Sequence, residues 1–226
     1  MSRPKQELTT TSYAILGFLA IKPWSTYELA TQMERTLNRM WPRARSKLYE
    51  EPKKLVARGL AKASDETVGK RPRTVYSITP AGRRALASWL HSPGSGPSLE
   101  FEQLIQVFFA DHGTAQDARR TLAATRSFAL DGLRTFHEAA TSYVDGGGPF
   151  PERAATNELG ARFMVDFYDT VLKWSEWASA VVATWPDDPS AARTDRDLFR
   201  DIVRRTAAIL QRSAREDDEF RGLRPS

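Results

Sequence analysis

In the N-terminal part of the chain, apolar residues recur at helical spacing in three stretches that polar residues separate. This spacing covers residues 11–21, a stretch that opens at Ser25–Glu28, and residues 43–58. Ser25–Glu28 has the sequence of a capping box, in which the first and last side chains each satisfy a free amide at the helix start. Gly59 suits the position that follows a helix end. The pattern predicts three short helices in succession.

A different period follows the third helix. Residues 60–64 and 74–79 have the pattern of short strands, the second with β-branched and aromatic residues in alternation. The intervening DETVGKRPR combines a glycine, a proline and several cations, which predicts a protruding, positive hairpin tip. Thr79 then caps a fourth helix, with Pro80 in its first position. Three helices, a hairpin and a helix are the order of a winged helix-turn-helix.

A segment rich in proline, glycine and serine separates this part from the rest, which has only helical patterns. We therefore predict a mainly α fold with a small β-hairpin. A winged helix-turn-helix domain covers 1–92, a linker covers 93–98, and an all-α dimerisation domain covers 99–226. The expected C-terminal helices span about 99–110, 114–144, 157–185 and 194–214.

Charge divides the chain at the same place. Residues 1–98 hold 17 Lys and Arg against 7 Asp and Glu, a formal charge of +10, whereas the remainder holds 16 against 21, a charge of −5. The N-terminal part therefore suits a polyanion, although a membrane surface or simple solubility can produce the same charge. The chain has no cysteine, no apolar run of membrane-spanning length and no apolar leader, so we expect a cytoplasmic protein without membrane contact.

The third helix and the hairpin carry the residues with the clearest chemistry. Cations on a helix face pair with phosphates or guanine edges, and hydroxyls bond either, so this surface favours double-stranded DNA. Wing cations suit the backbone or an adjacent minor groove, and the amides at the start of the second helix suit a phosphate. An ordinary solvated basic face is the alternative, and capping alone also explains the second-helix residues. The predicted DNA-binding residues are Arg43, Arg45, Ser46, Lys47, Tyr49, Lys53, Lys54, Lys70, Arg71, Arg73, Ser25, Thr26 and Tyr27.

Three residues in the third helix do not fit a recognition helix well. Pro52 removes the amide that would bond the Leu48 carbonyl, so a kink is expected before it. Glu50 and Glu51 add negative charge to a surface that should meet phosphates. These residues leave open a second hypothesis, a protein-interaction module on a winged-helix scaffold without sequence-specific DNA binding.

The longest C-terminal helix is apolar on more than one side. Its main stripe predicts a dimerisation surface, because a helix about 40 Å long with two apolar faces needs cover on both. An internal helix of a monomeric bundle has the same pattern. The predicted interface residues are Leu159, Phe163, Phe167, Val171, Trp174, Ala178 and Val181.

No arrangement for catalysis or metal binding is present in the sequence. His91, His112 and His137 lack partners at a diagnostic spacing, and no zinc, Walker or dinucleotide motif occurs. We therefore expect neither an enzyme nor a cofactor.

Three motifs resemble the PadR family of bacterial regulators. They are STYEL in the second helix, KLYEEPKKLVARGLA in the third helix, and GKRPRTVYSITPAG from the wing to the fourth helix. The resemblance covers about 85 residues, and the long C-terminal part looks like that of the larger PadR subgroup. It implies a homodimer on an inverted-repeat operator, acting as a repressor that a small phenolic or planar effector releases. The effector would bind within residues 99–226, by stacking on Trp174 and Trp177.

Overall fold

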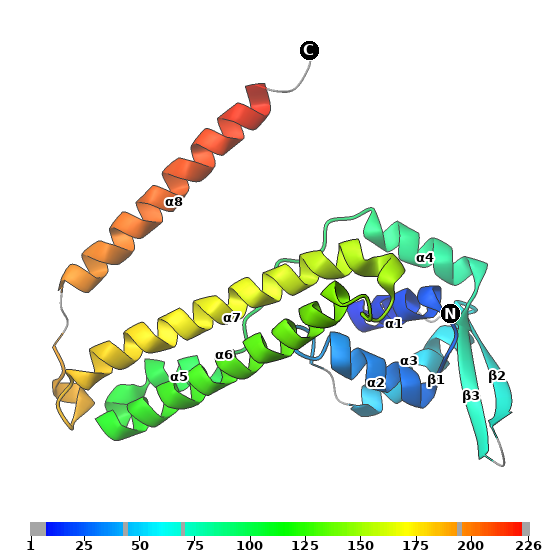
Figure 1. Ribbon diagram of the computed structural model, residues 1–226, viewed down its shortest axis with the longest axis horizontal. Helices are drawn as coiled ribbons and strands as arrows, with labels where there is room; N and C mark the ends of the chain where they lie inside the picture. The colour runs from blue at the N-terminus through cyan, green and yellow to red at the C-terminus, as the bar shows by residue number, and fades with distance from the viewer. Residues whose placement is uncertain (1–7, 43–44, 69–70, 194–195, 223–226) are drawn as a thin grey trace, which may run out of the picture. The chain divides into compact units, whose positions relative to one another are not determined.

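The computed structural model describes residues 8–42, 45–68, 71–193 and 196–222. Backbone contacts divide the chain into two compact units, residues 1–97 and 98–226. The predicted fold class is confirmed: the protein is mainly helical, with one small antiparallel sheet in the N-terminal unit (Figure 1).

The N-terminal unit has the element order of a winged helix. Each helix that the sequence predicts is present, and the capping boxes of Thr9 and Ser25 both form at the helix starts. The elements are α1 (Thr10–Ile21), β1 (Trp24–Ser25), α2 (Thr26–Thr36), α3 (Arg45–Ala57), β2 (Ala61–Val68), β3 (Arg71–Ile78) and α4 (Pro80–Leu90).

The sheet differs from the sequence expectation in two respects. The short strand β1 adds to the predicted hairpin, giving the order β1-β3-β2, with Trp24 paired to Tyr76. The hairpin strands are also longer than predicted, because Asp65–Val68 pair with Arg71–Thr74. DETV and RPR are therefore strand residues, and the prediction that they form the hairpin tip is wrong.

A close approach between α3 and α4 fixes the base of the wing. Thr79 donates its hydroxyl to the Gly59 carbonyl at 2.7 Å and accepts the Gly82 amide at 3.0 Å. A Cβ at Gly82 would overlap the Leu60 carbonyl oxygen, so only glycine fits there. The wing strands are thereby anchored at the end of α3.

The apolar residues that define the predicted helices form the core of this unit. Leu55 of α3 is completely buried, as is Leu29 of α2, and Ile15, Leu16 and Leu19 supply the α1 side. Burial of these residues leaves the opposite face of α3 to solvent.

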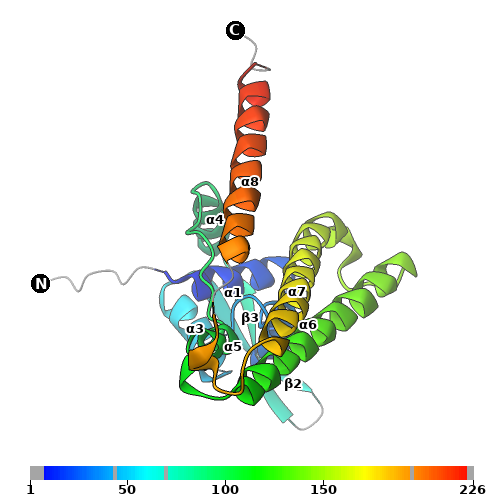
Figure 2. The ribbon, with the colours of Figure 1, turned by 90° about the vertical axis from the view of Figure 1, so that its left-hand side faces the viewer.

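The C-terminal unit is helical throughout its described part. Its helices are α5 (Glu102–Phe108), α6 (Ala115–Val144), α7 (Ala154–Ala183) and α8 (Arg196–Gly222), with short 3-10 turns at Ala110–His112, Pro151–Arg153 and Pro189–Ala191. Helices α6 and α7 run side by side over most of their length, as both views show (Figures 1 and 2). Among the described residues, no helix combines the length and the apolar character that a membrane crossing requires.

Tyr168 of α7 is the largest completely buried side chain in the part of the chain that the structure describes. Its ring lies against those of Phe128, Phe136 and Phe167, with centroids 5.5, 6.1 and 5.4 Å away. Gly132 of α6 lies directly beneath it, and a Cβ there would overlap the ring. This aromatic cluster joins the middle of the two long helices.

Candidate nucleic-acid interface

The outward face of α3 carries the predicted DNA-contacting side chains. Arg45, Ser46, Lys47 and Lys53 are exposed, whereas Tyr49 is half-buried. Leu48 and Leu55 point the other way, into the core. The helix therefore presents hydroxyl and cationic groups on one side, as a helix that enters the major groove requires.

Arg45 opens α3 and is held by two residues of α2. Its Nε lies 3.1 Å from Oε1 of Glu34, and its guanidinium carbon lies 5.7 Å from the ring centre of Tyr27. Tyr27 and Glu34 are seven residues apart, so they lie two turns apart on one face of α2. Neither residue was predicted from the sequence to contact Arg45, although their common face is visible in the spacing.

Glu51 does not place its charge on the exposed face of α3. It is only 8% exposed and accepts a hydrogen bond from the Ser12 hydroxyl of α1 at 2.5 Å. Lys54 lies 3.2 Å from its other carboxylate oxygen. Pro52 is also buried, and α3 continues through it from Arg45 to Ala57. The charge of Glu50 remains exposed.

The start of α2 is closed by its own capping box. The Ser25 amide and hydroxyl donate to Oε2 of Glu28 at 2.9 and 2.6 Å. These two hydrogen bonds, and then the charges of Arg73 and Lys22, hold the pKa of Glu28 below its ordinary value of 4.5 against the opposing effect of burial. Ser25 is buried, Thr26 is half-buried and Tyr27 is exposed.

Arg73 connects the wing to α2. Its two terminal nitrogens lie 3.6 Å from Glu28 and 2.9 Å from Glu66, its partner across the β2-β3 ladder. A phosphate at this position would have to compete with two carboxylates. Arg43, Lys70 and the side chain of Arg71 lie outside the described residues.

The predicted dimerisation residues of α7 occupy two different environments. Val171 and Ala178 are buried, and Ala178 shares a core with residues of α6. Leu159 and Phe163 are 75% and 61% exposed. Phe167, Trp174 and Val181 are half-buried. One side of α7 is thus covered by α6 and the adjacent side is open.

The two tryptophans predicted to bind an effector also differ. Trp174 packs beside the core of the unit and edge-on to Phe101, at a centroid distance of 6.0 Å. Trp177 is 51% exposed.

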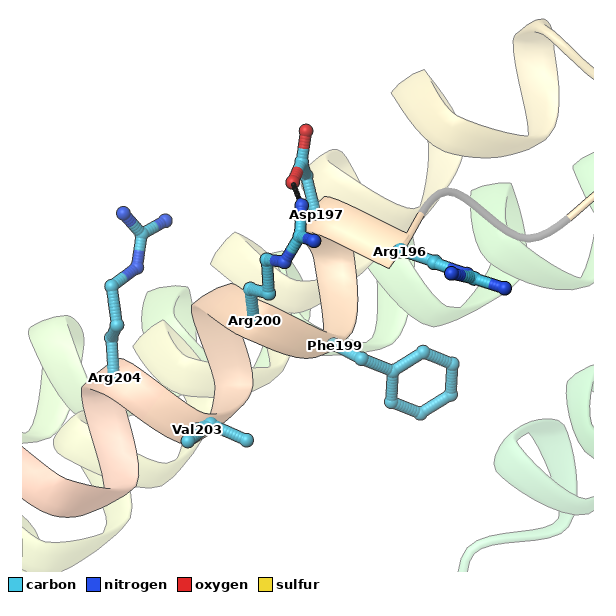
Figure 3. A pocket seen from close by; sticks show the side chains of 6 residues that line it. All are labelled: Arg196, Asp197, Phe199, Arg200, Val203 and Arg204. Atoms are coloured by element: carbon cyan, nitrogen blue, oxygen red, sulfur yellow. Dashed lines mark hydrogen bonds and ion pairs between the residues drawn. The ribbon is translucent and has the colours of Figure 1, made fainter.

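A surface depression lies on α8, but it does not have the form of a ligand pocket. All of its six lining residues come from the one helix, and Arg200 pairs with Asp197 within it while Phe199 and Val203 point away from Arg204 (Figure 3). A site lined by one helix lacks the enclosing walls of a ligand pocket. Among the described residues, no three His, Asp or Glu side chains are grouped so as to hold a metal ion.

Comparison with known proteins gives one family and several similar structures. Residues 15–88 match the Transcriptional regulator PadR-like family. The structure resembles smu.1604c from Streptococcus mutans, with 21% identity, a TM-score of 0.68, and coverage of 76% of this chain and 99% of that one. No curated protein matches the sequence.

Two structures of one Bacillus subtilis protein are also similar. PadR in complex with operator DNA has 20% identity and a TM-score of 0.67, and PadR in complex with p-coumaric acid has 20% identity and a TM-score of 0.61. In each case the similarity covers 77% of this chain and 99% of the other.

Proposed function

We propose that the chain, whose residues 15–88 match the Transcriptional regulator PadR-like family, is a regulator of this family that represses transcription by binding an inverted-repeat operator as a homodimer. A small aromatic or planar effector releases it from DNA. Regulators of this family are not enzymes, so its chemistry is that of recognition.

The outward face of α3 is the observation that carries the DNA-binding proposal. Arg45, Ser46, Lys47 and Lys53 are exposed together there, on the element that the winged-helix order assigns to the major groove. The burial of Glu51 against Ser12 removes one of the two negative charges that opposed this role. The B. subtilis relative, with the same fold, was solved with operator DNA.

Two uncovered apolar faces support a homodimer. Leu159, Phe163 and Trp177 leave one side of α7 open. Helix α8 exposes a second set of large apolar side chains, namely Phe199, Ile202, Val203, Ile209 and Leu210. Exposed apolar surface of this extent marks an interaction site in a water-soluble protein. A second copy, related by a twofold axis, covers the same faces on both protomers.

The effector proposal rests on aromatic side chains and on a relative. Trp174 and Trp177 lie one turn apart on α7, and the exposed ring of Trp177 is free to stack on a planar molecule. The B. subtilis PadR structure with p-coumaric acid supports a ligand of this class.

Selection of duplexes from random DNA by the full-length chain tests the function. We expect an enriched inverted repeat whose half-sites are centred about 10 base pairs apart, because two recognition helices in a dimer lie about 34 Å apart. Footprinting of the enriched duplex then shows two protected half-sites. If no sequence is enriched above the starting pool, the chain is not an operator-binding protein, and the interaction-module hypothesis takes its place.

A further inference from the structure

Arg45 has one part of its guanidinium fixed and another part unoccupied. Its Nε contacts Oε1 of Glu34, and its guanidinium carbon lies over the Tyr27 ring, 5.7 Å from the ring centre. Among the described residues, no hydrogen bond or ion pair engages its two terminal nitrogens. The side chain is 49% exposed, so this edge is accessible to a ligand.

The unoccupied edge is the one that reads guanine end-on. The two terminal N–H groups of arginine match the O6 and N7 acceptors of guanine, and this bidentate pair is the commonest specific contact in the major groove. Arg45 is the first residue of α3, and the N-terminal residues of a recognition helix are those that reach base edges. An arginine on a long, free side chain would lose more conformational freedom on binding than one already held.

We propose that Glu34 is a positioning residue that holds Arg45 in the orientation for reading a guanine, and that it thereby sets sequence specificity without touching DNA. The proposal rests on the proposed function. Glu34 lies on α2, outside the recognition helix, and its own charge opposes binding to phosphates. It therefore weakens DNA binding in general while sharpening the choice of sequence.

This pair of opposite effects gives the test a distinctive outcome. Glu34→Gln removes the charge and the strong acceptor but keeps the shape of the side chain. Affinity for a scrambled duplex should rise, because a negative charge near the phosphates is removed. The preference for the enriched duplex over the scrambled one should fall by about 5-fold, because the guanidinium is no longer held for its bidentate contact.

Glu50→Gln is the matched control. Glu50 is exposed on α3, and its replacement removes the same charge, but it makes no described contact with Arg45. This variant should raise affinity for both duplexes equally and leave the preference unchanged. Adding Glu34→Gln to an Arg45→Ala variant should likewise cause no further loss of preference, because the group being positioned is already absent.

Fluorescence anisotropy with the two duplexes at one fixed salt concentration measures these ratios, and thermal unfolding checks that each variant is folded. The expected result is a loss of preference in Glu34→Gln that is absent in Glu50→Gln. Equal behaviour of the two single variants overturns the positioning role while leaving the DNA-binding function intact. A wild-type chain that prefers no duplex overturns both proposals.

Discussion

Replacing Tyr168 with alanine is expected to lower the free energy of unfolding by about 3–5 kcal/mol, the usual cost of deleting a large buried aromatic ring. Tyr168 is completely buried and contacts three other rings, so its removal leaves a cavity between α6 and α7. Urea denaturation followed by circular dichroism measures the change. Leu90→Ala is the control, because Leu90 is 68% exposed and its truncation should cost less than about 0.5 kcal/mol.

Gly132 provides a second way to examine the same packing. Gly132→Ala alone should destabilise the protein by about 1–3 kcal/mol, because the added methyl group overlaps the Tyr168 ring. In the double variant with Tyr168→Ala the ring is gone, so the combined destabilisation should be smaller than the sum of the two single effects. Strictly additive effects, or a Tyr168→Ala variant as stable as wild type, would contradict the packing described for this cluster.

Ser12→Ala is expected to lower the free energy of unfolding by about 1–3 kcal/mol. It leaves the buried Glu51 carboxylate without its hydroxyl partner and removes the acceptor of the Thr9 amide in the capping box of α1. The two residues join α1 to α3 through a hydrogen bond of 2.5 Å, and both are almost inaccessible to water. The remaining ion pair with Lys54 engages the other carboxylate oxygen and cannot replace this bond. Ser88→Ala, at an exposed serine of α4, should change stability by less than about 0.5 kcal/mol.

A double variant separates the hydrogen bond from burial alone. Replacing both partners by apolar residues removes the unsatisfied groups, so Ser12→Ala combined with Glu51→Leu should cost less than the sum of the single changes. Chemical denaturation of the four proteins completes the cycle. An unchanged midpoint in Ser12→Ala would contradict the buried hydrogen bond between Ser12 and Glu51.

Local patterns in the sequence were sufficient to predict the helices of the N-terminal unit. Capping at Ser25 depends on Glu28 three residues away, and the period of the apolar residues depends only on neighbouring turns. Strand β1 could not be predicted in the same way. It has two residues and exists because β3 pairs with it.

The sequence predicts wing strands that are too short, because polar residues in a short segment favour a loop. Asp65 and Glu66 are polar, yet they are strand residues because Thr74 and Arg73 lie opposite them and bond their carboxylates. Cross-strand pairing of this kind is a tertiary property that a single strand does not reveal.

The environment of Glu51 was the least accessible feature of the candidate interface. Its partner Ser12 is 39 residues earlier in the chain, and only the packing of α1 on α3 brings them together. The apolar stripe on α7 was predicted as one surface because the packing of a neighbouring helix on it is likewise not visible in the sequence. Val171 and Ala178 are buried but Leu159 and Phe163 are exposed, and sequence spacing alone does not say which side a neighbouring helix occupies.

The salt dependence of DNA binding tests most directly whether α3 and the wing bind DNA. The full-length chain is compared with a triple variant, Arg45→Ala, Lys47→Ala and Arg71→Ala, on a promoter-derived and a random duplex. A matched triple variant, Arg126→Ala, Arg134→Ala and Arg162→Ala, removes the same charge from exposed arginines of α6 and α7. We predict tight, salt-steep binding by wild type and by the matched variant. In the variant that lacks Arg45, Lys47 and Arg71, the slope of log affinity against log salt should fall by about 0.9 for each phosphate that the protein no longer neutralises. Binding that is absent in wild type, or equal in both triple variants, would contradict the assignment of α3 and the wing to DNA.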